Sequence, residues 1–381
     1  MDIGLTEELL QYRDEVVRFA QNELNDDVIG RDADSAFSRD AWKKCAAFGL
    51  QGLPLPETYG GSNADAVTIM IAMEALGYGC KDNGLIFSLN AQMWSCEIPI
   101  MTFGTDEQKS RYLPGLCDGS LIGVQGMTEP GSGSDAFALA TTATRSGDRY
   151  VLNGTKTFIT NAPVADVFVI FASTDPALGF AGISAFLVDR DTPGLTVGRP
   201  FHKMGLRTSP MSELAFADCE VPAEKMIGRP GAGMAIFNSS MDWERSFILG
   251  SAVGSMQRQL ERCVAYAQER KQFGRPIGDF QAVSHTIVDM RVRVETSRLL
   301  LRNLAALKTK GASTVAESAM AKLYVSECFV QTSLDALQIH GGYGYMTEYE
   351  LERDVRDAIA GRIYSGTSQI QRNIIARHMQ L

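Results

Sequence analysis

The loop Gly126–Asp135 holds the densest group of residues with a capacity for chemistry. Its glycines and proline prevent a regular helix or strand, and the hydroxyls of Thr128, Ser132 and Ser134 crowd into one short turn. Backbone amides of a glycine-rich turn can donate to a phosphate or to an electron-rich ring. The loop therefore predicts a ligand site, although a tight turn without function uses the same residue types.

A second stretch, Gln338–Tyr345, carries three glycines and is followed by Glu348, Arg353 and Asp357. Two long patterns in a fixed order are more specific than one glycine motif. Together they resemble the two signatures of the acyl-CoA dehydrogenase family, and the resemblance extends over essentially the whole chain. It implies bound FAD and the α,β-dehydrogenation of an acyl thioester. In that reaction a carboxylate removes the α-proton and the β-hydrogen leaves as a hydride to the flavin.

The resemblance offers two positions for the catalytic base. In most of the family a glutamate precedes the Gly-Thr of a C-terminal Tyr-Glu-Gly-Thr sequence, but here Ser365 stands at that position. A serine cannot act as a base near pH 7 without another group to take its proton. Some relatives with branched or long substrates carry the base at the position matching Glu244, so Glu244 is predicted to be the catalytic residue. The alternative is a glutamate at a helix start that pairs with Arg245 or interacts with the helix dipole.

The other site residues are also implied by the resemblance. Arg270–Gly274 matches a motif that contacts the flavin pyrophosphate of a neighbouring subunit, although a helix end followed by glycine looks the same. Predicted FAD contacts are Met127, Thr128, Gly133, Ser134, Phe158, Ile159, Thr160, Arg270, Gln272, Phe273, Gln281, Gln338, Gly341, Gly342, Thr367 and Gln369. Predicted substrate contacts are Ser134, Asp242, Arg245, Ser365 and Gly366. The backbone N–H of residue 365 is expected to bind the thioester carbonyl, and no metal site is predicted.

The substrate class is narrowed by Ser365, by the run Ser240–Glu244 and by the segments Leu85–Ala91 and Asn161–Phe168. These resemble enzymes that oxidise an aminoacyl group, such as prolyl, on a carrier protein in secondary metabolism. The segment Lys203–Arg207 instead matches ordinary acyl-CoA enzymes. A short or branched acyl-CoA is therefore the first alternative. A flavin oxidase or monooxygenase, and a non-catalytic acyl-binding scaffold on the same fold, are the others.

Composition limits the partners and the compartment. The chain has 381 residues, of which 45% are hydrophobic and 21% charged, and a net charge of −9 argues against nucleic acid or anionic membrane as the main partner. No apolar run reaches the length of a membrane span, and the first residues lack the features of a signal peptide. The seven cysteines form no close pair, which favours reduced thiols in the cytoplasm. The family resemblance adds a homo-oligomer, commonly a tetramer, and an electron-transfer flavoprotein as acceptor.

Hydrophobic periodicity predicts a mainly α protein with a central β domain. The expected domains are an α-helical one at 1–120, a small β-barrel or sandwich at 121–229 and a helical bundle at 230–381. Leu85–Ile100 is expected to be one buried helix, and Asn153-Gly154 is expected to form the turn of a β-hairpin. Met241–Arg245 is expected to open a helix of the bundle.

Overall fold

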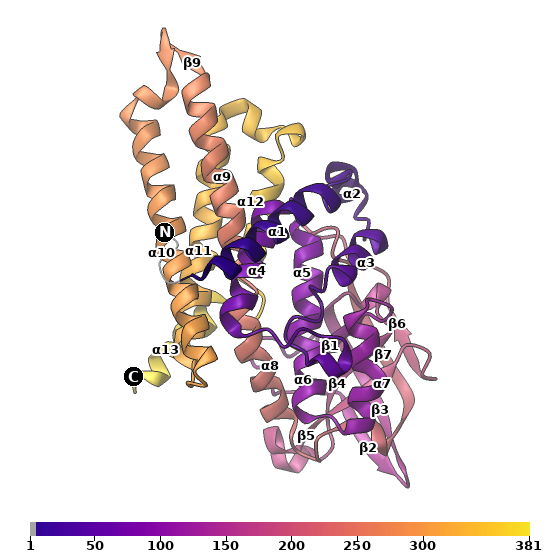
Figure 1. The fold of residues 1–381 in the computed structure, drawn as a ribbon. Helices are drawn as coiled ribbons and strands as arrows, with labels where there is room; N and C mark the ends of the chain where they lie inside the picture. The colour runs from indigo at the N-terminus through magenta and orange to yellow at the C-terminus, as the bar shows by residue number, and fades with distance from the viewer. Residues whose placement is uncertain (1–4) are drawn as a thin grey trace.

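The computed structural model describes residues 5–381 and shows a helical region, a β-sheet region and a second helical region in chain order, as predicted (Figure 1). Side-chain caps fix several helix starts. Thr6 accepts a hydrogen bond from the Leu9 N–H at 3.3 Å, and Asp65 and Asp82 cap the fourth and fifth helices. The N-terminal helices are α1 (Glu7–Glu23), α2 (Val28–Asp34), α3 (Arg39–Ala47), α4 (Ala66–Gly79), α5 (Asn83–Gln92), α6 (Ile98–Phe103) and α7 (Asp106–Cys117).

Leu85–Ile100 is helical and largely buried as predicted, but a π-helical turn, η2 (Met93–Glu97), interrupts the α-helical hydrogen bonding between α5 and α6. Pro99 follows this turn and has no N–H to donate to the carbonyl of Ser95, four residues earlier. The side chain of Gln125 donates to that carbonyl instead, at 3.1 Å. Such turns are frequent at functional sites, and η2 contacts both the sheet and the C-terminal bundle.

The central sheet has eight strands in the order β6-β7-β3-β2-β4-β5-β8, with β1 paired in parallel to β4. The predicted hairpin turn at Asn153-Gly154 is wrong, because β3 continues through it and the turn lies at Gly147-Asp148. Gly154 is needed for close packing, since a Cβ there would lie 2.5 Å from the Thr141 hydroxyl. The strands are β1 (Gly123–Gly126), β2 (Thr142–Ser146), β3 (Arg149–Thr160), β4 (Val167–Ser173), β5 (Ile183–Asp189), β6 (Leu195–Val197), β7 (Met211–Pro222) and β8 (Met226–Ile227).

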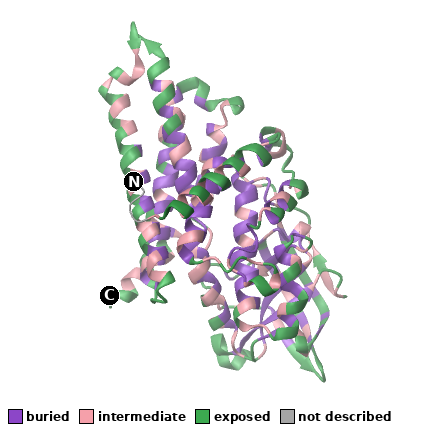
Figure 2. Cartoon of the chain, in the orientation of Figure 1, coloured by how far each residue is buried: buried purple, intermediate pink, exposed green. Residues whose placement is uncertain are grey.

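The C-terminal helices form a bundle whose α9–α10 end extends away from the sheet (Figure 1). The short strands β9 (Lys271–Gln272) and β10 (Arg275–Pro276) make a hairpin at that end, which is largely exposed (Figure 2). At the other end of α9 a Cβ on Gly77 would lie 1.9 Å from the Ser251 carbonyl, so this glycine lets α4 pack against α9. The helices are α8 (Gly233–Phe247), α9 (Gly250–Glu269), α10 (Gln281–Thr309), α11 (Val315–His340), α12 (Leu351–Ala360) and α13 (Ser368–His378).

No helix among residues 5–381 has both the length and the apolar character needed to cross a membrane.

Candidate active site

Glu244 lies in the last turn of α8, near the end of the helix and not at its start as the sequence indicated. The helix begins at Gly233, because the apolar positions before Met241 already belong to it. A carboxylate near a helix C-terminus gains nothing from the helix dipole, so the dipole interpretation of Glu244 is wrong. The side chain is buried, with 8% of its surface exposed. A charged group in this position needs hydrogen-bond partners.

Two hydroxyls supply those partners. Ser95 Oγ donates to Glu244 Oε2 at 2.6 Å, and Ser365 Oγ donates to Oε1. Ser95 comes from η2 and Ser365 from the turn between α12 and α13, so three distant parts of the chain meet at one carboxylate. Ser365, at the position of the family's usual base, is therefore in direct contact with Glu244.

The turn 364–367 is preformed. Ser365 and Gly366 both have left-handed backbone conformations, with φ of 55° and 89°. Arg245 Nε donates to the Ser365 carbonyl at 3.0 Å, and Lys322 Nζ donates to the Gly366 carbonyl at 2.7 Å. Gln371 Nε2 bonds both carbonyls, at 3.1 and 2.9 Å. These donors fix the backbone so that its amides keep their direction when a ligand binds.

Two desolvated cations thus lie behind this turn. Burial lowers the pKa of Lys322 to about 8, and Arg245 adds to this effect while Glu244 and Glu327 oppose it. Burial likewise lowers the pKa of the Arg245 guanidinium. Burial, with the charge of Glu244, raises the pKa of the Tyr364 hydroxyl. Charges withdrawn from water act more strongly on negative charge that develops nearby.

An aromatic cluster packs between the elements that carry Ser95 and Glu244. Trp94 lies next to Glu244's partner Ser95, and its ring centroid is 6.0 Å from that of Trp243 and 5.1 Å from that of Phe247. Phe87 packs against Tyr364 with centroids 4.8 Å apart. Asp242, a predicted substrate contact, forms an ion pair with Lys308 and accepts a hydrogen bond from Thr314. The elements that carry Ser95 and Glu244 are thus joined by an aromatic core, and Asp242 is engaged by Lys308 and Thr314.

The loop Gly126–Asp135 is attached to β3 by a buried ion pair. Lys156 Nζ lies 2.7 Å from Glu129 Oε1 and also donates to the Met127 carbonyl at 3.2 Å. Glu129 further accepts from the N–H groups of Ala140 and Thr141 at 2.6 and 3.0 Å. Burial alone would raise the pKa of Glu129, but Lys156 and these donors hold it below its usual value. The loop is therefore a rigid platform.

The ligand-facing part of this platform is open. Gly133 and Ser134 are exposed, and a Cβ on Gly133 would meet nothing within 4 Å. Phe158 has a φ of 58° and is 63% exposed. Bulky residues rarely adopt a positive φ, and large aromatic side chains are usually buried. Ile159 is buried and Thr160 is half-buried beside it. This exposed aromatic edge above open backbone fits the ring system of a flavin.

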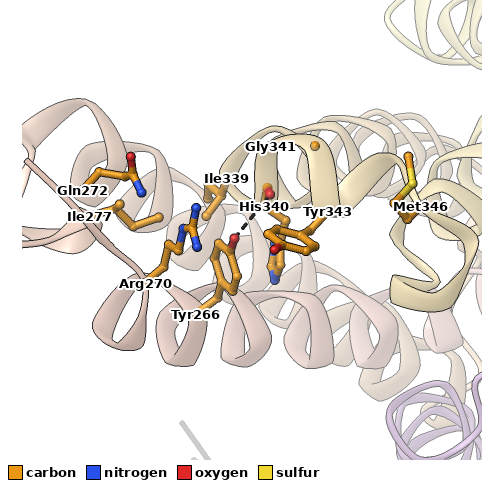
Figure 3. A pocket seen from close by; sticks show the side chains of 10 residues that line it. Tyr266, Arg270, Gln272, Ile277, Ile339, His340, Gly341, Tyr343 and Met346 are labelled. Atoms are coloured by element: carbon orange, nitrogen blue, oxygen red, sulfur yellow. Dashed lines mark hydrogen bonds between the residues drawn. The ribbon is translucent and has the colours of Figure 1, made fainter.

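A separate cavity of about 430 Å³ lies between the tip of α9 and the end of α11 (Figure 3). The Arg270 guanidinium lies 5.7 Å from the Tyr343 ring centroid, and Gly341 has a φ of 59° with open space around it. A guanidinium beside open glycine backbone fits a pyrophosphate. The lining residues are Tyr266, Arg270, Gln272, Ile277, Ile339, His340, Gly341, Gly342, Tyr343 and Met346.

The structure therefore divides the predicted cofactor residues into groups. Met127, Thr128, Gly133, Ser134, Phe158, Ile159 and Thr160 lie in the sheet region, whereas Arg270, Gln272, Gly341 and Gly342 line the distant cavity (Figure 1). Phe273, Gln281 and Gln338 are exposed near that cavity. Thr367 caps α13 through a 3.3 Å hydrogen bond from the Ile370 N–H, and Gln369, two residues later, is exposed.

Sequence reasoning missed Ser95 and Lys322. A signal for Ser95 exists in Pro99, which makes an unbroken helix over this segment unfavourable. Lys322 stands among small apolar residues of α11, where a charged side chain must find a buried partner. Neither pattern predicts which residue Ser95 or Lys322 contacts. Among residues 5–381, no cluster of three or more potential ligands is arranged to hold a metal ion.

Three domain families match the sequence in succession. These are "Acyl-CoA dehydrogenase, N-terminal domain" at residues 6–120, the "middle domain" at 125–219 and the "C-terminal domain" at 231–380. An L-prolyl-[peptidyl-carrier protein] dehydrogenase from Serratia sp. is 43% identical over 381 residues, which cover 100% of this chain and 99% of the relative.

Solved structures agree with the sequence matches. The prolyl acyl carrier protein oxidase AnaB is 49% identical, with a TM-score of 0.98 over 99% of this chain and 100% of the other. The structure described as PigA with FAD and proline is 42% identical, with a TM-score of 0.98 and 100% of both chains covered.

Proposed function

This chain belongs to the acyl-CoA dehydrogenase family, and we propose that it is an FAD-dependent dehydrogenase of a prolyl or related aminoacyl thioester attached to a carrier protein. The observation that carries the proposal is the arrangement of a buried carboxylate, Glu244, in contact with the turn at Ser365–Gly366. This contact supports the proposal because it brings a carboxylate next to the turn whose backbone N–H is proposed to bind the thioester carbonyl.

Glu244 takes up the α-proton in this proposal. The α C–H bond breaks, its electron pair moves into the enolate of the thioester, and the proton passes to the carboxylate. The N–H of residue 365 donates to the thioester oxygen, and the cations of Arg245 and Lys322 behind the turn stabilise the developing negative charge. When bound, FAD supplies the acceptor for the β-hydride. The exposed edge at Phe158 and the loop at Gly133–Ser134 would hold its ring system.

The substrate assignment rests on the relatives. The Serratia relative is described as acting on prolyl attached to a peptidyl carrier protein, and AnaB as a prolyl acyl carrier protein oxidase. Prolyl on a carrier protein is therefore preferred over a short or branched acyl-CoA. A short-chain acyl-CoA dehydrogenase from Homo sapiens is 42% identical over 361 residues, which keeps the second substrate class as the alternative.

Anaerobic incubation of the FAD-loaded protein tests the substrate. Prolyl-carrier protein should bleach the flavin and lose two mass units, whereas prolyl-CoA, butyryl-CoA and isovaleryl-CoA should react at least about tenfold more slowly. Bleaching by an acyl-CoA alone would reject the carrier-linked assignment. Rapid reoxidation of the reduced enzyme by air would identify an oxidase, while slow reoxidation that a dye or an electron-transfer flavoprotein accelerates would identify a dehydrogenase.

We also propose that the FAD site is completed by a second copy of the chain. The exposed hairpin with Phe273, and the cavity at Arg270 and Gly341, lie at the far end of the bundle from the sheet region (Figure 1). One chain thus offers two half-sites to two different cofactors, which a dimer or tetramer would combine. The seven cysteines, all buried and unpaired among residues 5–381, favour a reducing cytoplasm.

A further inference from the structure

The contacts of the Glu244 carboxylate define a feature that the proposed reaction does not by itself require. Each of its two oxygens accepts a hydrogen bond from a serine hydroxyl, Oε2 from Ser95 and Oε1 from Ser365. The two donors come from different elements, η2 and the turn 364–367. A carboxylate held at both oxygens has a fixed plane as well as a fixed position.

Ser95 is held in place by a network of its own. Gln125 Nε2 donates to the Ser95 carbonyl at 3.1 Å and to Ser240 Oγ at 3.1 Å. Ser240 lies one turn before Glu244 on α8, so Gln125 links η2 to the helix that carries the base. Ser95 is 7% exposed and Ser240 is fully buried, which limits competition from water. The Pro99 gap in the α-helical ladder is what leaves the Ser95 carbonyl for Gln125.

Ser365 is held in place by contacts of its own backbone. Its own carbonyl is bound by Arg245 and Gln371, so the residue cannot turn freely although it is only half-buried. Ser365 thus has two roles, a hydroxyl that donates to the base and a backbone N–H that the proposed function assigns to the thioester carbonyl.

We propose that Ser95 and Ser365 are positioning residues that clamp the Glu244 carboxylate between two hydroxyls and aim it at the α-carbon of the substrate. The proposal rests on the proposed function for the identity of the reacting atom. Ser95, held by Gln125, fixes one carboxylate oxygen. Ser365, held by Arg245 and Gln371, fixes the other.

Rapid mixing under anaerobic conditions measures the effect on proton abstraction. Ser95→Ala should slow flavin bleaching by prolyl-carrier protein about ten- to a hundredfold. The concentration for half-saturation should change little, because Ser95 contacts the base and not the carrier arm. Ser365→Ala should slow it only about three- to tenfold, since Ser365 is half-buried and water can replace its hydroxyl, whereas Ser95 is buried. A substrate deuterated at the α-carbon should show a larger isotope effect with both variants.

Matched variants separate positioning from folding. Ser95→Thr keeps the hydroxyl and should restore most of the rate, whereas Ser88→Ala removes a buried hydroxyl of α5 that bonds Ser209 and should leave the rate unchanged. If Ser95→Ala reacts at the wild-type rate with an unchanged isotope effect, the clamp is wrong. An equal loss in Ser88→Ala would show that any buried hydroxyl in this region matters, which also overturns it.

An infrared measurement without substrate keeps the clamp testable if the substrate assignment fails. The protein is labelled with ¹³C-carboxyl glutamate, and subtraction of the Glu244→Gln spectrum isolates the carboxylate band of Glu244. Loss of either hydroxyl should shift this band, and Ser88→Ala should not. If the band shifts in the serine variants but no thioester reduces the flavin of the wild-type protein, the proposed function is rejected and the clamp is supported. An unshifted band in Ser95→Ala rejects the clamp.

Discussion

The surroundings of Glu244 and the cavity at the tip of α9 are built in opposite ways. The Glu244 region is buried and closed by its own hydrogen bonds from Ser95, Ser365, Arg245 and Lys322. The tip cavity is open, and its hairpin carries Phe273 with 94% of its surface exposed. The contacts of Glu244 all come from one chain, whereas the tip cavity presents charged and aromatic groups that stay open among residues 5–381. In the proposed function, one chain therefore carries out proton abstraction and two chains bind the cofactor.

Removal of the base should give the largest effect. Glu244→Gln keeps the size of the side chain and its capacity to accept from Ser95, but it cannot take a proton. We expect flavin bleaching by substrate to fall by about a thousandfold or more, with FAD content and fold unchanged. Stopped-flow absorbance after reconstitution measures the rate.

Glu97 provides the matched control for that variant. It is also a buried glutamate, two residues from Ser95, and burial raises its pKa to about 8, so it is mostly protonated at neutral pH. Glu97→Gln therefore removes little charge and should change the rate less than about threefold. Equal losses in the two variants would show that Glu244 is one of several structural carboxylates.

A substitution at the tip cavity should weaken FAD binding by an intermediate amount, because the cavity is proposed to complete the FAD site of a second copy. Arg270→Ala removes the guanidinium from the cavity, and we expect FAD to bind about ten- to a hundredfold more weakly. Fluorescence titration of the apoprotein with FAD measures the affinity. Arg275→Ala is the control, because Arg275 lies 4.2 Å over the Phe280 ring in the same hairpin and does not line the cavity.

Dilution tests the contrast between the two regions. If FAD is held by two chains, its release should coincide with dissociation of the oligomer, followed by light scattering and flavin fluorescence together. FAD that stays bound to a monomer with full affinity would contradict the division of the site between copies.

The smallest effect is expected from the cation behind the turn. Lys322→Met keeps the length and apolar stem of the side chain but removes the charge near the thioester, and the bleaching rate should fall about tenfold. Lys322→Arg should recover part of the rate. A rate in Lys322→Met equal to that of the wild type would show that Arg245 alone supplies the charge.

The same residue gives a prediction on stability. The pKa of Lys322 is about 8 in the folded chain and 10.5 in the unfolded one, so between these values the unfolded state binds up to one more proton. The free energy of unfolding should therefore rise with pH from about 8 to 10.5 on account of this residue. Chemical denaturation should show a smaller rise in Lys322→Met. Lys156 and Lys203 have pKa values lowered similarly to about 8, so only the difference between the two proteins is informative.

Much of the fold could be predicted because its signals are local. Periodicity and caps such as Thr6 predict the helices, and the α, β, α order follows from the change in period. The wrong predictions concern short segments whose conformation is decided by packing. Asn153-Gly154 has the composition of a hairpin turn, but Gly154 is required by the nearby Thr141 and β3 runs on. Met241–Arg245 is expected at a helix start, but the apolar residues Ile236 and Phe237 before it already belong to α8.

The sequence by itself determined that the usual base is missing, since Ser365 cannot remove an α-proton, and it directed attention to Glu244. Only the tertiary structure decided what surrounds that carboxylate. Ser95 and Ser365 are 149 and 121 residues away from Glu244 along the chain, and their contacts depend on a π-helical turn and a left-handed turn. Periodicity reports which face of an element is buried, but the direction of a hydrogen bond between remote elements is set only when they pack.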